Sequence, residues 1–320
     1  MLFSGIPFLL YFLPCVLLVY FIVPQKGRNA VLLAASLFFY GWGEPKFLLF
    51  MVFSIVQGYV FARLIGRGRR KKLFLTLSLV LSFALLGYCK YADFFIENFN
   101  AVTGLSLPLL KIALPIGISF YTFQIASYEI DVYRGDVAAQ HNFIDFAAYV
   151  AMFPQLIAGP IVRYRDIAPQ LKERTHSLEA AASGASRFAV GLGKKVLVAN
   201  VLAQLVSAYK ASAEQTALYA WLYTIAFTLQ IYFDFSGYSD MAIGLGRMFG
   251  FAYGEKENGA VFSHMAVMYA NALYRRGFAH EGWKALKALA DTALDFDTSR
   301  IYPGIPEYFR ADGRGMYHYL

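Results

Sequence analysis

A series of long apolar runs constrains this chain more than any other feature. The first covers residues 7–24 and reads PFLLYFLPCVLLVYFIVP, and others cover residues 30–42, 46–64 and 73–88. A helix of about 20 apolar residues crosses about 30 Å of hydrocarbon. Because backbone groups in lipid must find partners within the chain, and no stretch alternates like a barrel strand, the runs predict an all-α polytopic transmembrane helical bundle.

Composition excludes several classes of protein. The 320 residues are 58% hydrophobic and 16% charged, with a mean hydropathy of +0.47, which excludes a soluble globular domain, a disordered chain and a disulfide scaffold. Cys15 and Cys89 lie in apolar runs and are expected to be small buried hydrophobic side chains. The five histidines lack the spacing of a metal site, and no nucleotide- or phosphate-binding motif occurs. We therefore expect no metal and no bound cofactor.

The basic residues predict the orientation of the chain. The net charge of +8 lies entirely in residues 1–251, where Lys and Arg flank the apolar runs, while residues 252–320 are neutral. This fits the cytoplasmic bias of Lys and Arg in membrane proteins better than nucleic-acid binding. No basic residue precedes the first run, whereas Lys26 and Arg28 follow it, so we expect a retained helix with the N-terminus outside. The basic cluster at residues 67–72 then falls on the same, cytoplasmic face.

Two later stretches combine apolar residues with helix breakers. They are LPIGISFYTFQIASYEIDVYR at residues 114–134 and FPQLIAGPIVRY at residues 153–164. Helix breakers at membrane depth need protein or water around the freed backbone groups, so residues 153–164 predict a re-entrant or surface-lying segment that lines a cavity. A cytoplasmic loop with solvated Arg163, Arg165, Lys172 and Arg174 fits the spacing equally well. Residues 90–100 form either an outer loop or a surface helix.

Polar groups recur in the last apolar regions. Residues 183–209 are basic in their first half and should enter the membrane from the basic side, and the glycines of GLGKK at residues 191–195 indicate close helix packing. Residues 231–244 read IYFDFSGYSDMAIG and place Asp234 and Asp240 among apolar residues. Ionisable groups at membrane depth mark functional sites. The alternative is an interfacial loop whose Ser and Asp residues cap a following helix.

The composition changes after Phe251. Residues 252–320 contain no run long enough to span a membrane, and residues 266–274 and 281–294 predict two amphipathic helices of a soluble αα-hairpin. We therefore expect two domains, residues 1–251 in the membrane and residues 252–320 outside it.

Several motifs resemble a known family. ASLFFYGWGEPKFLLF, LPIGISFYTFQ, FPQLIAGPIVRYRDI and IYFDFSGYSDMAIGLGRMFGF resemble the membrane-bound O-acyltransferases, in the bacterial branch that includes the alginate O-acetyltransferases. The resemblance implies a multi-pass protein of the bacterial inner membrane. It would move an acyl group from a cytoplasmic thioester, such as acetyl-CoA or an acyl carrier, toward an extracytoplasmic glycan and a periplasmic acyltransferase partner. It also implies motif or tunnel-lining positions, which are Gln155, Asp234, Ser236, Tyr238 and Asp240.

The same resemblance implies no catalytic residue here. The family's essential histidine, a general base on the acceptor hydroxyl, follows the motif at residues 231–244 in a segment similar to WRRWH, which this sequence lacks. We therefore expect a truncated member without acyl transfer. The alternative is a non-catalytic membrane module that binds an acylation partner or a lipid-linked glycan through residues 153–165 and 231–244.

The tail resembles a different family. ENGAVFSH at residues 257–264 and YPGIPEYFRADGRGMYHYL at residues 302–320 are similar to a C-terminal stretch of the cellobiose phosphorylase-like glycoside phosphorylases. This resemblance implies an α-helical fragment, joined by fusion, in which His264 is a remnant of a phosphate site.

Overall fold

The computed structural model describes residues 2–43, 45–156, 163–212, 216–251, 261–294, 308–309 and 315–316. The chain divides into two compact units, Met1–Phe251 and Ala252–Leu320.

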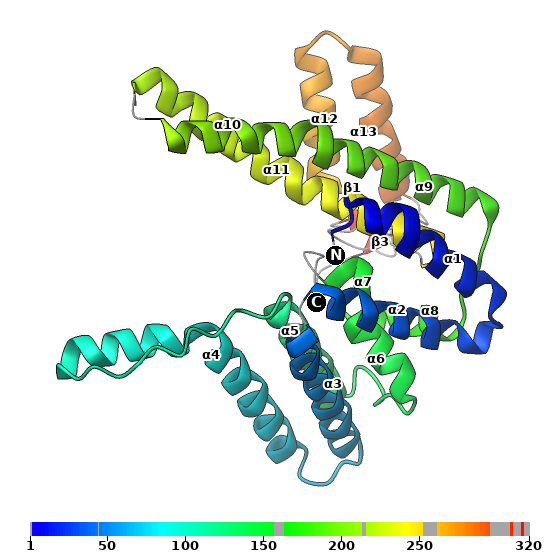
Figure 1. Ribbon diagram of the computed structural model, residues 1–320. Coiled ribbons are helices and arrows are strands. Elements are labelled where there is room, and N and C mark those ends of the chain that lie inside the picture. The colour runs from blue at the N-terminus through cyan, green and yellow to red at the C-terminus, as the bar shows by residue number, and fades with distance from the viewer. Residues whose placement is uncertain are drawn as a thin grey trace. The chain divides into compact units, whose positions relative to one another are not determined.

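The first unit is built from helices, as predicted (Figure 1). In chain order they are the π-helix Pro7–Phe12, α1 (Leu13–Ile22), the 3₁₀ turn Gln25–Gly27, α2 (Arg28–Gly43), α3 (Pro45–Gly66), α4 (Lys71–Thr103), α5 (Ile118–Arg134), α6 (Phe143–Ala151), α7 (Phe153–Leu156), α8 (Tyr164–Lys172), α9 (Leu178–Gly193), the π-helix Lys194–Ala199, α10 (Asn200–Ala211) and α11 (Ala217–Met248). Residues 90–100 continue α4 and form no loop, so the helical alternative is correct for them.

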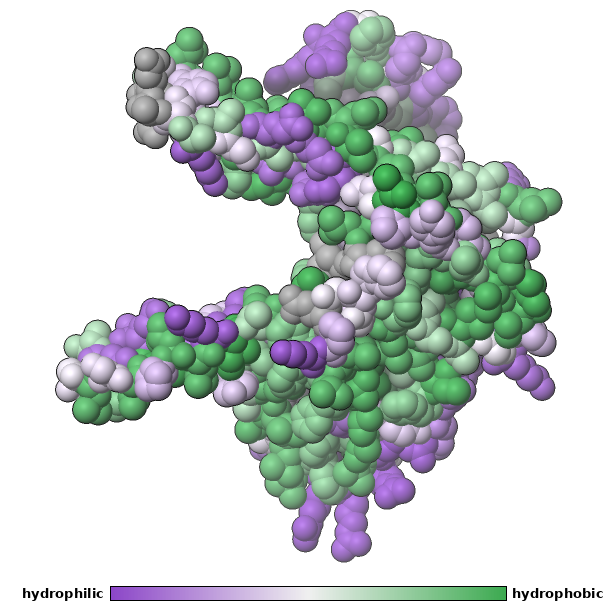
Figure 2. All heavy atoms as spheres, in the orientation of Figure 1, coloured by the Kyte–Doolittle hydropathy of each residue, from purple (hydrophilic) through white to green (hydrophobic). Residues whose placement is uncertain are grey.

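Three helices of the described residues are long and apolar enough to cross a membrane. They are α3, α4 and the continuous helix Leu178–Ala211, which joins α9 to α10 through a π-helical turn. They coincide with three of the predicted membrane segments. The helix Pro7–Ile22 is shorter, and at 1.5 Å per residue it measures about 24 Å. Figure 2 shows a hydrophobic surface over α3 that ends in hydrophilic residues at the α3–α4 loop.

Polar side chains tie α3, α4 and α5 together below this surface. Ser82 donates to Gln57 at 3.0 Å, and Gln57 donates to Ser78. Ser78 donates in turn to Glu129, whose side chain is completely buried. Such interhelical hydrogen bonds hold helices together where lipid removes the hydrophobic driving force. They fix α5 against the two spanning helices.

Aromatic rings fill the centre of the first unit. Phe8, Phe12, Phe39 and Phe153 are buried, and their ring centroids lie 5.4 to 6.2 Å apart. The two cysteines differ from each other. Cys89 is buried as predicted, but Cys15 is exposed, so its predicted burial is wrong. An apolar side chain of a membrane helix can face lipid, and apolar neighbours therefore do not predict burial.

The second unit contains the predicted αα-hairpin. Its helices are α12 (Ser263–Arg275) and α13 (Ala279–Leu294), and Gly277 takes a positive φ of 84° in the turn between them. Ala270 and Leu289 are buried in this unit. The strands β1 (Val261–Phe262), β2 (Tyr308–Phe309) and β3 (Gly315–Met316) pair antiparallel in the order β1-β2-β3.

Candidate functional site

Glycines bring α9 and α11 into backbone contact. A Cβ atom on Gly191 would lie 2.5 Å from the carbonyl oxygen of Gly237, and one on Gly184 would lie 2.6 Å from that of Gly244. Small residues allow this approach between membrane helices. The close packing predicted for the glycines at residues 191–195 is therefore confirmed for Gly191 but not for Gly193, where an added Cβ would meet nothing within 4 Å. The approach at Gly191 places the polar side chains of the two helices next to each other.

The predicted motif at residues 231–244 lies inside α11, a single helix that covers Ala217–Met248. The alternative of an interfacial loop with a capped helix is therefore wrong. Ser236 and Asp240 do not need to cap a helix end, because their polar atoms find partners on the neighbouring helix.

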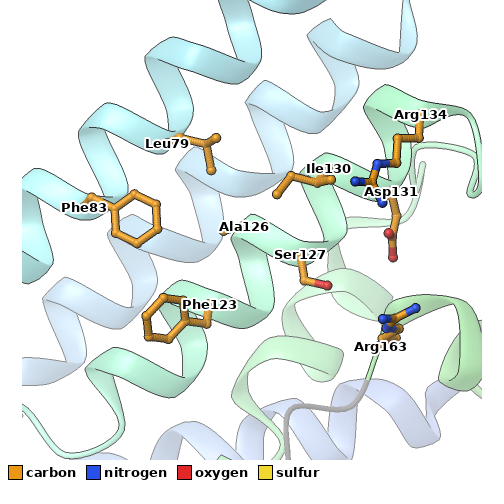
Figure 3. Close-up of a pocket in the computed structure, with 9 residues that line it drawn as sticks. All are labelled: Leu79, Phe83, Phe123, Ala126, Ser127, Ile130, Asp131, Arg134 and Arg163. Atoms are coloured by element: carbon orange, nitrogen blue, oxygen red, sulfur yellow. The ribbon is translucent and has the colours of Figure 1, made fainter. Parts of the chain in front are cut away.

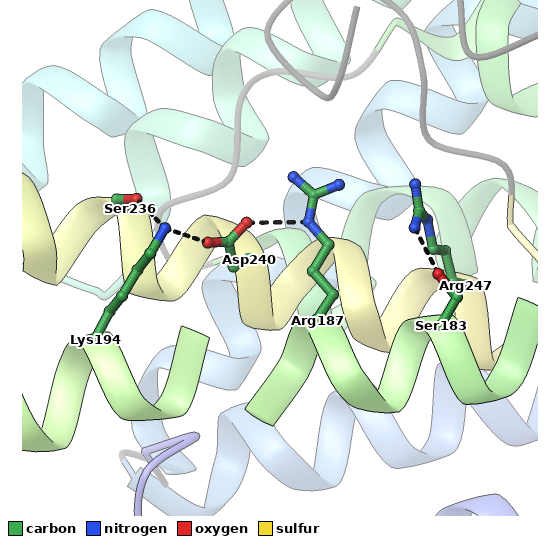
Figure 4. A network of polar contacts seen from close by, with 6 residues as sticks. All are labelled: Ser183, Arg187, Lys194, Ser236, Asp240 and Arg247. Atoms are coloured by element: carbon green, nitrogen blue, oxygen red, sulfur yellow. Dashed lines mark hydrogen bonds and ion pairs between the residues drawn. The ribbon is translucent and has the colours of Figure 1, made fainter. Parts of the chain in front are cut away.

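Asp240 is the centre of this network (Figure 4). Its Oδ1 lies 3.0 Å from Nε of Arg187, and its Oδ2 lies 2.6 Å from Nζ of Lys194. The same Nζ donates to Oγ of Ser236 at 3.0 Å. The Asp240 side chain is 15% exposed, so the two cations largely replace its hydration. Charge-assisted hydrogen bonds of this length are the strong ones in proteins.

The network continues in both directions along the two helices. Nζ of Lys195 lies 2.5 Å from Oδ1 of Asp234, and Nη1 of Arg247 donates to Oγ of Ser183 at 3.0 Å. Positions 183 and 195 are about 18 Å apart along a helix that rises 1.5 Å per residue. We call this set of polar residues the α9–α11 seam; it consists of Arg187, Lys194, Lys195, Asp234, Ser236 and Asp240. It carries three cations and two carboxylates, and its charged side chains are 15 to 45% exposed.

Tyr238 and Gln155 lie outside the contact between α9 and α11. Tyr238 Oη donates to the carbonyl oxygen of Pro154 at 2.8 Å, and its ring stacks on Phe3 with centroids 5.1 Å apart. Gln155 Nε2 donates to the carbonyl of Tyr149 at 2.9 Å, while its buried Oε1 has no hydrogen-bond partner among the described residues. The structure thus places Asp234, Ser236 and Asp240 in the contact between α9 and α11, whereas Tyr238 contacts Pro154, the residue before Gln155.

The segment at residues 153–164 is only partly described, since residues 157–162 lie outside the described residues. Residues 153–156 are all buried, which contradicts the surface-loop alternative for this half. Arg174 is also buried. It donates to Asn29, and its guanidinium lies 4.6 Å from the ring centroid of Phe251. The expectation of a solvated Arg174 is wrong, because these contacts replace water.

A second polar cluster surrounds His176 in the loop before α9. Tyr20 Oη donates to the carbonyl of Phe249 at 2.7 Å and lies 3.0 Å from Nε2 of His176. Arg28 Nη1 lies 3.2 Å from Nδ1. The single hydroxyl proton of Tyr20 is donated to Phe249, so Tyr20 must accept a hydrogen bond from Nε2 of His176. Arg28 can only donate, so Nδ1 must accept. The neutral tautomer with its hydrogen on Nε2 satisfies both contacts. Burial, followed by the charges of Arg28 and Arg174, lowers the pKa of His176 below its ordinary value.

Sequence reasoning missed the partners within both clusters. Arg187 and Lys194 are seven residues apart, and Ser236 and Asp240 are four apart, so each pair shares one face of its helix. That periodicity was the available signal on each helix, but it does not say which faces meet. Among the described residues, no three His, Cys, Asp or Glu side chains gather as a metal site would need.

Comparisons with known proteins place the seam inside a family match. The model of the membrane-bound O-acyltransferase family, MBOAT, matches residues 111–283. A probable alginate O-acetylase from Pseudomonas aeruginosa is 47% identical over 266 residues, which are 81% of this chain and 51% of that protein. One from Azotobacter vinelandii is 46% identical, with 81% and 53% covered. A peptidoglycan O-acetyltransferase from Helicobacter pylori is 35% identical over 285 residues, with 78% and 54% covered.

The chain spans about half the length of the curated relatives it matches. The family match extends past Phe251 into the second unit, beyond the point at which the motifs above cease to resemble the family. The resemblance of the tail to glycoside phosphorylases stays a prediction. So does the assignment of His264, whose side chain lies outside the described part.

Proposed function

Because the chain belongs to the membrane-bound O-acyltransferase family, we propose that it takes part in moving an acyl group from a thioester donor to a glycan. The names of its relatives give the acceptor class, since they act as O-acetylases of alginate and of peptidoglycan. The proposed donor is acetyl-CoA or an acyl carrier. This multi-pass protein would lie in the cytoplasmic membrane of a bacterium and deliver the acyl group to a periplasmic acyltransferase partner.

The seam is the observation that carries this proposal. Its three cations outnumber its two carboxylates, and its charged side chains are partly exposed. Both acetyl-CoA and the prosthetic group of an acyl carrier contain phosphate, which Arg and Lys bind through charge-assisted hydrogen bonds. Asp240 holds Arg187 and Lys194 toward each other, so the cations are preorganised before a donor arrives. In this proposal Arg187, Lys194 and Lys195 bind the donor, and no residue acts as a general base.

Loop contacts support the proposed side on which the donor would enter. Asn29 donates to Asp145 near the start of α6 at 2.7 Å, and Tyr59 near the end of α3 donates to the carbonyl of His141 at 2.6 Å. The loops that carry Arg28 and residues 67–72 therefore lie on one face, as the basic-residue bias requires. We call this the basic face. The proposal assigns it to the cytoplasm and the N-terminus to the outside.

A second candidate function is a non-catalytic membrane module that binds an acylation partner or a lipid-linked glycan. The engagement of both ring nitrogens of His176 by Tyr20 and Arg28 favours it, because this ring cannot then accept a proton from an acceptor hydroxyl.

The test uses the full chain reconstituted in lipid nanodiscs, with acetyl-CoA labelled in the acetyl group and with alginate or peptidoglycan as acceptor. We expect saturable binding of acetyl-CoA, which desulfo-CoA competes for and free acetate does not. Label on the glycan would support acyl transfer by this chain, whereas binding without glycan label would favour the non-catalytic module. A chain that neither binds acetyl-CoA nor labels the glycan would overturn the proposal.

A further inference from the structure

A cavity between α4 and α5 lies apart from the seam (Figure 3). Its volume is about 390 Å³. One end is apolar and is lined by Leu79, Phe83 and Phe123, with the two phenylalanine rings 5.9 Å apart. The other end is charged and is lined by Asp131, Arg134 and Arg163. The cavity therefore offers one charged and one apolar environment to a single occupant.

The charged end lies at the basic face. Arg134 is the last residue of α5, and α4 begins at Lys71, directly after the basic α3–α4 loop. A Cβ atom on Gly66, the last residue of α3, would lie 2.8 Å from the Cβ of Ala139, which follows α5. The ends of α3 and α5 are therefore close neighbours. The apolar end lies further along α4, toward the middle of that spanning helix.

The surface around the cavity is suited to lipid. Only 22% of the most apolar window of α4 is buried in the protein. Leu77, Val80 and Leu81, on the turns beside Leu79, are 47%, 61% and 39% exposed. Exposed apolar side chains on a membrane-spanning helix face acyl chains. An occupant can therefore enter the cavity sideways from the bilayer.

We propose that this cavity binds an anionic phospholipid. The phosphate group lies between Arg134 and Arg163, and an acyl chain follows Leu79, Phe83 and Phe123. Around Asp131, the three guanidinium groups of Arg134, Arg163 and Arg165 outnumber the two carboxylates of Asp131 and Asp136. This end therefore carries a positive charge, which complements a phosphate. Basic pockets between membrane helices on the cytoplasmic side recognise anionic headgroups, and each Lys or Arg near the surface contributes about 1 kcal/mol, or about fivefold in affinity.

Native mass spectrometry of the full chain, with phosphatidylglycerol and phosphatidylcholine of the same acyl chains, tests the proposal. We expect phosphatidylglycerol to bind more tightly. Arg134→Gln and Arg163→Gln should each weaken its binding about fivefold, and Asp131→Asn should strengthen it by a similar factor. Ser127→Phe, which fills the cavity and retains its charges, should weaken the binding of both lipids there. The matched control Arg69→Gln, in the exposed α3–α4 loop, should have no effect.

Three results would overturn the proposal. The first is equal affinity for the two lipids, and the second is an Arg134→Gln variant that behaves like Arg69→Gln. The third is displacement of phosphatidylglycerol by inorganic phosphate at the same concentration, which would assign the charged end to a free anion. If Arg163→Gln does not fold, Arg134→Gln and Asp131→Asn still decide the question, because they change the charge in opposite directions.

Discussion

Gly191 on α9 and Gly237 on α11 lie so close that a Cβ atom on Gly191 would be 2.5 Å from the carbonyl oxygen of Gly237 and 2.7 Å from the amide nitrogen of Met241. Both of these atoms belong to the backbone, so they cannot move aside as a flexible side chain can. This approach sets the distance at which Arg187 and Lys194 reach Asp240 across the two helices.

Gly191→Ala is expected to destabilise the first unit. Overpacking of this kind costs about 1 to 3 kcal/mol, more than the gain of about 1 kcal/mol that Ala brings to a helix. The measurement is thermal unfolding of the purified chain in detergent. The matched control is Gly193→Ala on the same helix, because a Cβ there meets nothing within 4 Å. Equal melting temperatures for the two variants would contradict the close-packing account.

Asp240→Asn is expected to destabilise the chain more than Asp234→Asn. Asp240 pairs with two cations and is 15% exposed, whereas Asp234 pairs with Lys195 and is 45% exposed. Asp240→Asn removes the charge from two hydrogen bonds in a part-buried site, and a hydrogen bond to a charged group contributes about 1.5 to 3 kcal/mol, less where water reaches the cations. Unfolding in denaturant measures the difference. A larger loss of unfolding free energy in Asp234→Asn than in Asp240→Asn would contradict this account, because the pair of Asp234 with Lys195 would then stabilise the seam more.

Tyr238→Phe is expected to loosen the contact between α7 and α11. The variant loses the 2.8 Å hydrogen bond to Pro154 but keeps the ring that stacks on Phe3. The loss of one hydrogen bond to a buried carbonyl costs about 1 kcal/mol. Tyr232→Phe, at a position that is 61% exposed, is the control. Hydrogen exchange at residues 153–156 should accelerate in Tyr238→Phe alone, and unchanged exchange would contradict the role of this hydrogen bond.

The pH dependence of stability is expected to depend on His176. Burial and the charges of Arg28 and Arg174 lower its pKa in the folded chain, so the unfolded chain binds this proton more tightly. The stabilising contribution is therefore complete above the ordinary histidine pKa of about 6.5, and it is lost as the pH falls below that value. Melting temperatures measured between about pH 7 and pH 5 should fall less in His176→Gln than in the unsubstituted chain. His141→Gln, at an exposed position, should retain the full pH dependence.

The parts of the fold that hydropathy controls could be predicted from the sequence. The helices at residues 46–64 and 73–88 and the αα-hairpin of the second unit follow from local apolar patterns, which do not depend on the rest of the chain. The pairing of Arg187 with Asp240 joins positions 53 residues apart, and that of Arg28 with His176 joins positions 148 apart. Such pairs depend on which helix faces meet, and one sequence does not contain that information.

Two of the expectations that proved wrong, those for residues 231–244 and for Arg174, share a physical cause. Ser and Asp side chains favour caps and loops when they lack hydrogen-bond partners. Ser236 and Asp240 nevertheless lie inside α11, because Lys194 of the neighbouring helix bonds to both side chains. Arg174 would prefer water, but Asn29 and the ring of Phe251 replace it. In each case a tertiary contact changed the environment that the local sequence predicts.

The affinity of the chain for acetyl-CoA, compared between Lys195→Gln and Lys210→Gln, tests the central claim most directly. Both substitutions remove a lysine from the helix Leu178–Ala211, but only Lys195 belongs to the seam. If the seam binds the phosphates of the donor, Lys195→Gln should weaken binding about tenfold, the effect of one charge-assisted hydrogen bond, and Lys210→Gln should leave it unchanged. Equal affinities in the two variants would contradict the assignment of the seam to the donor.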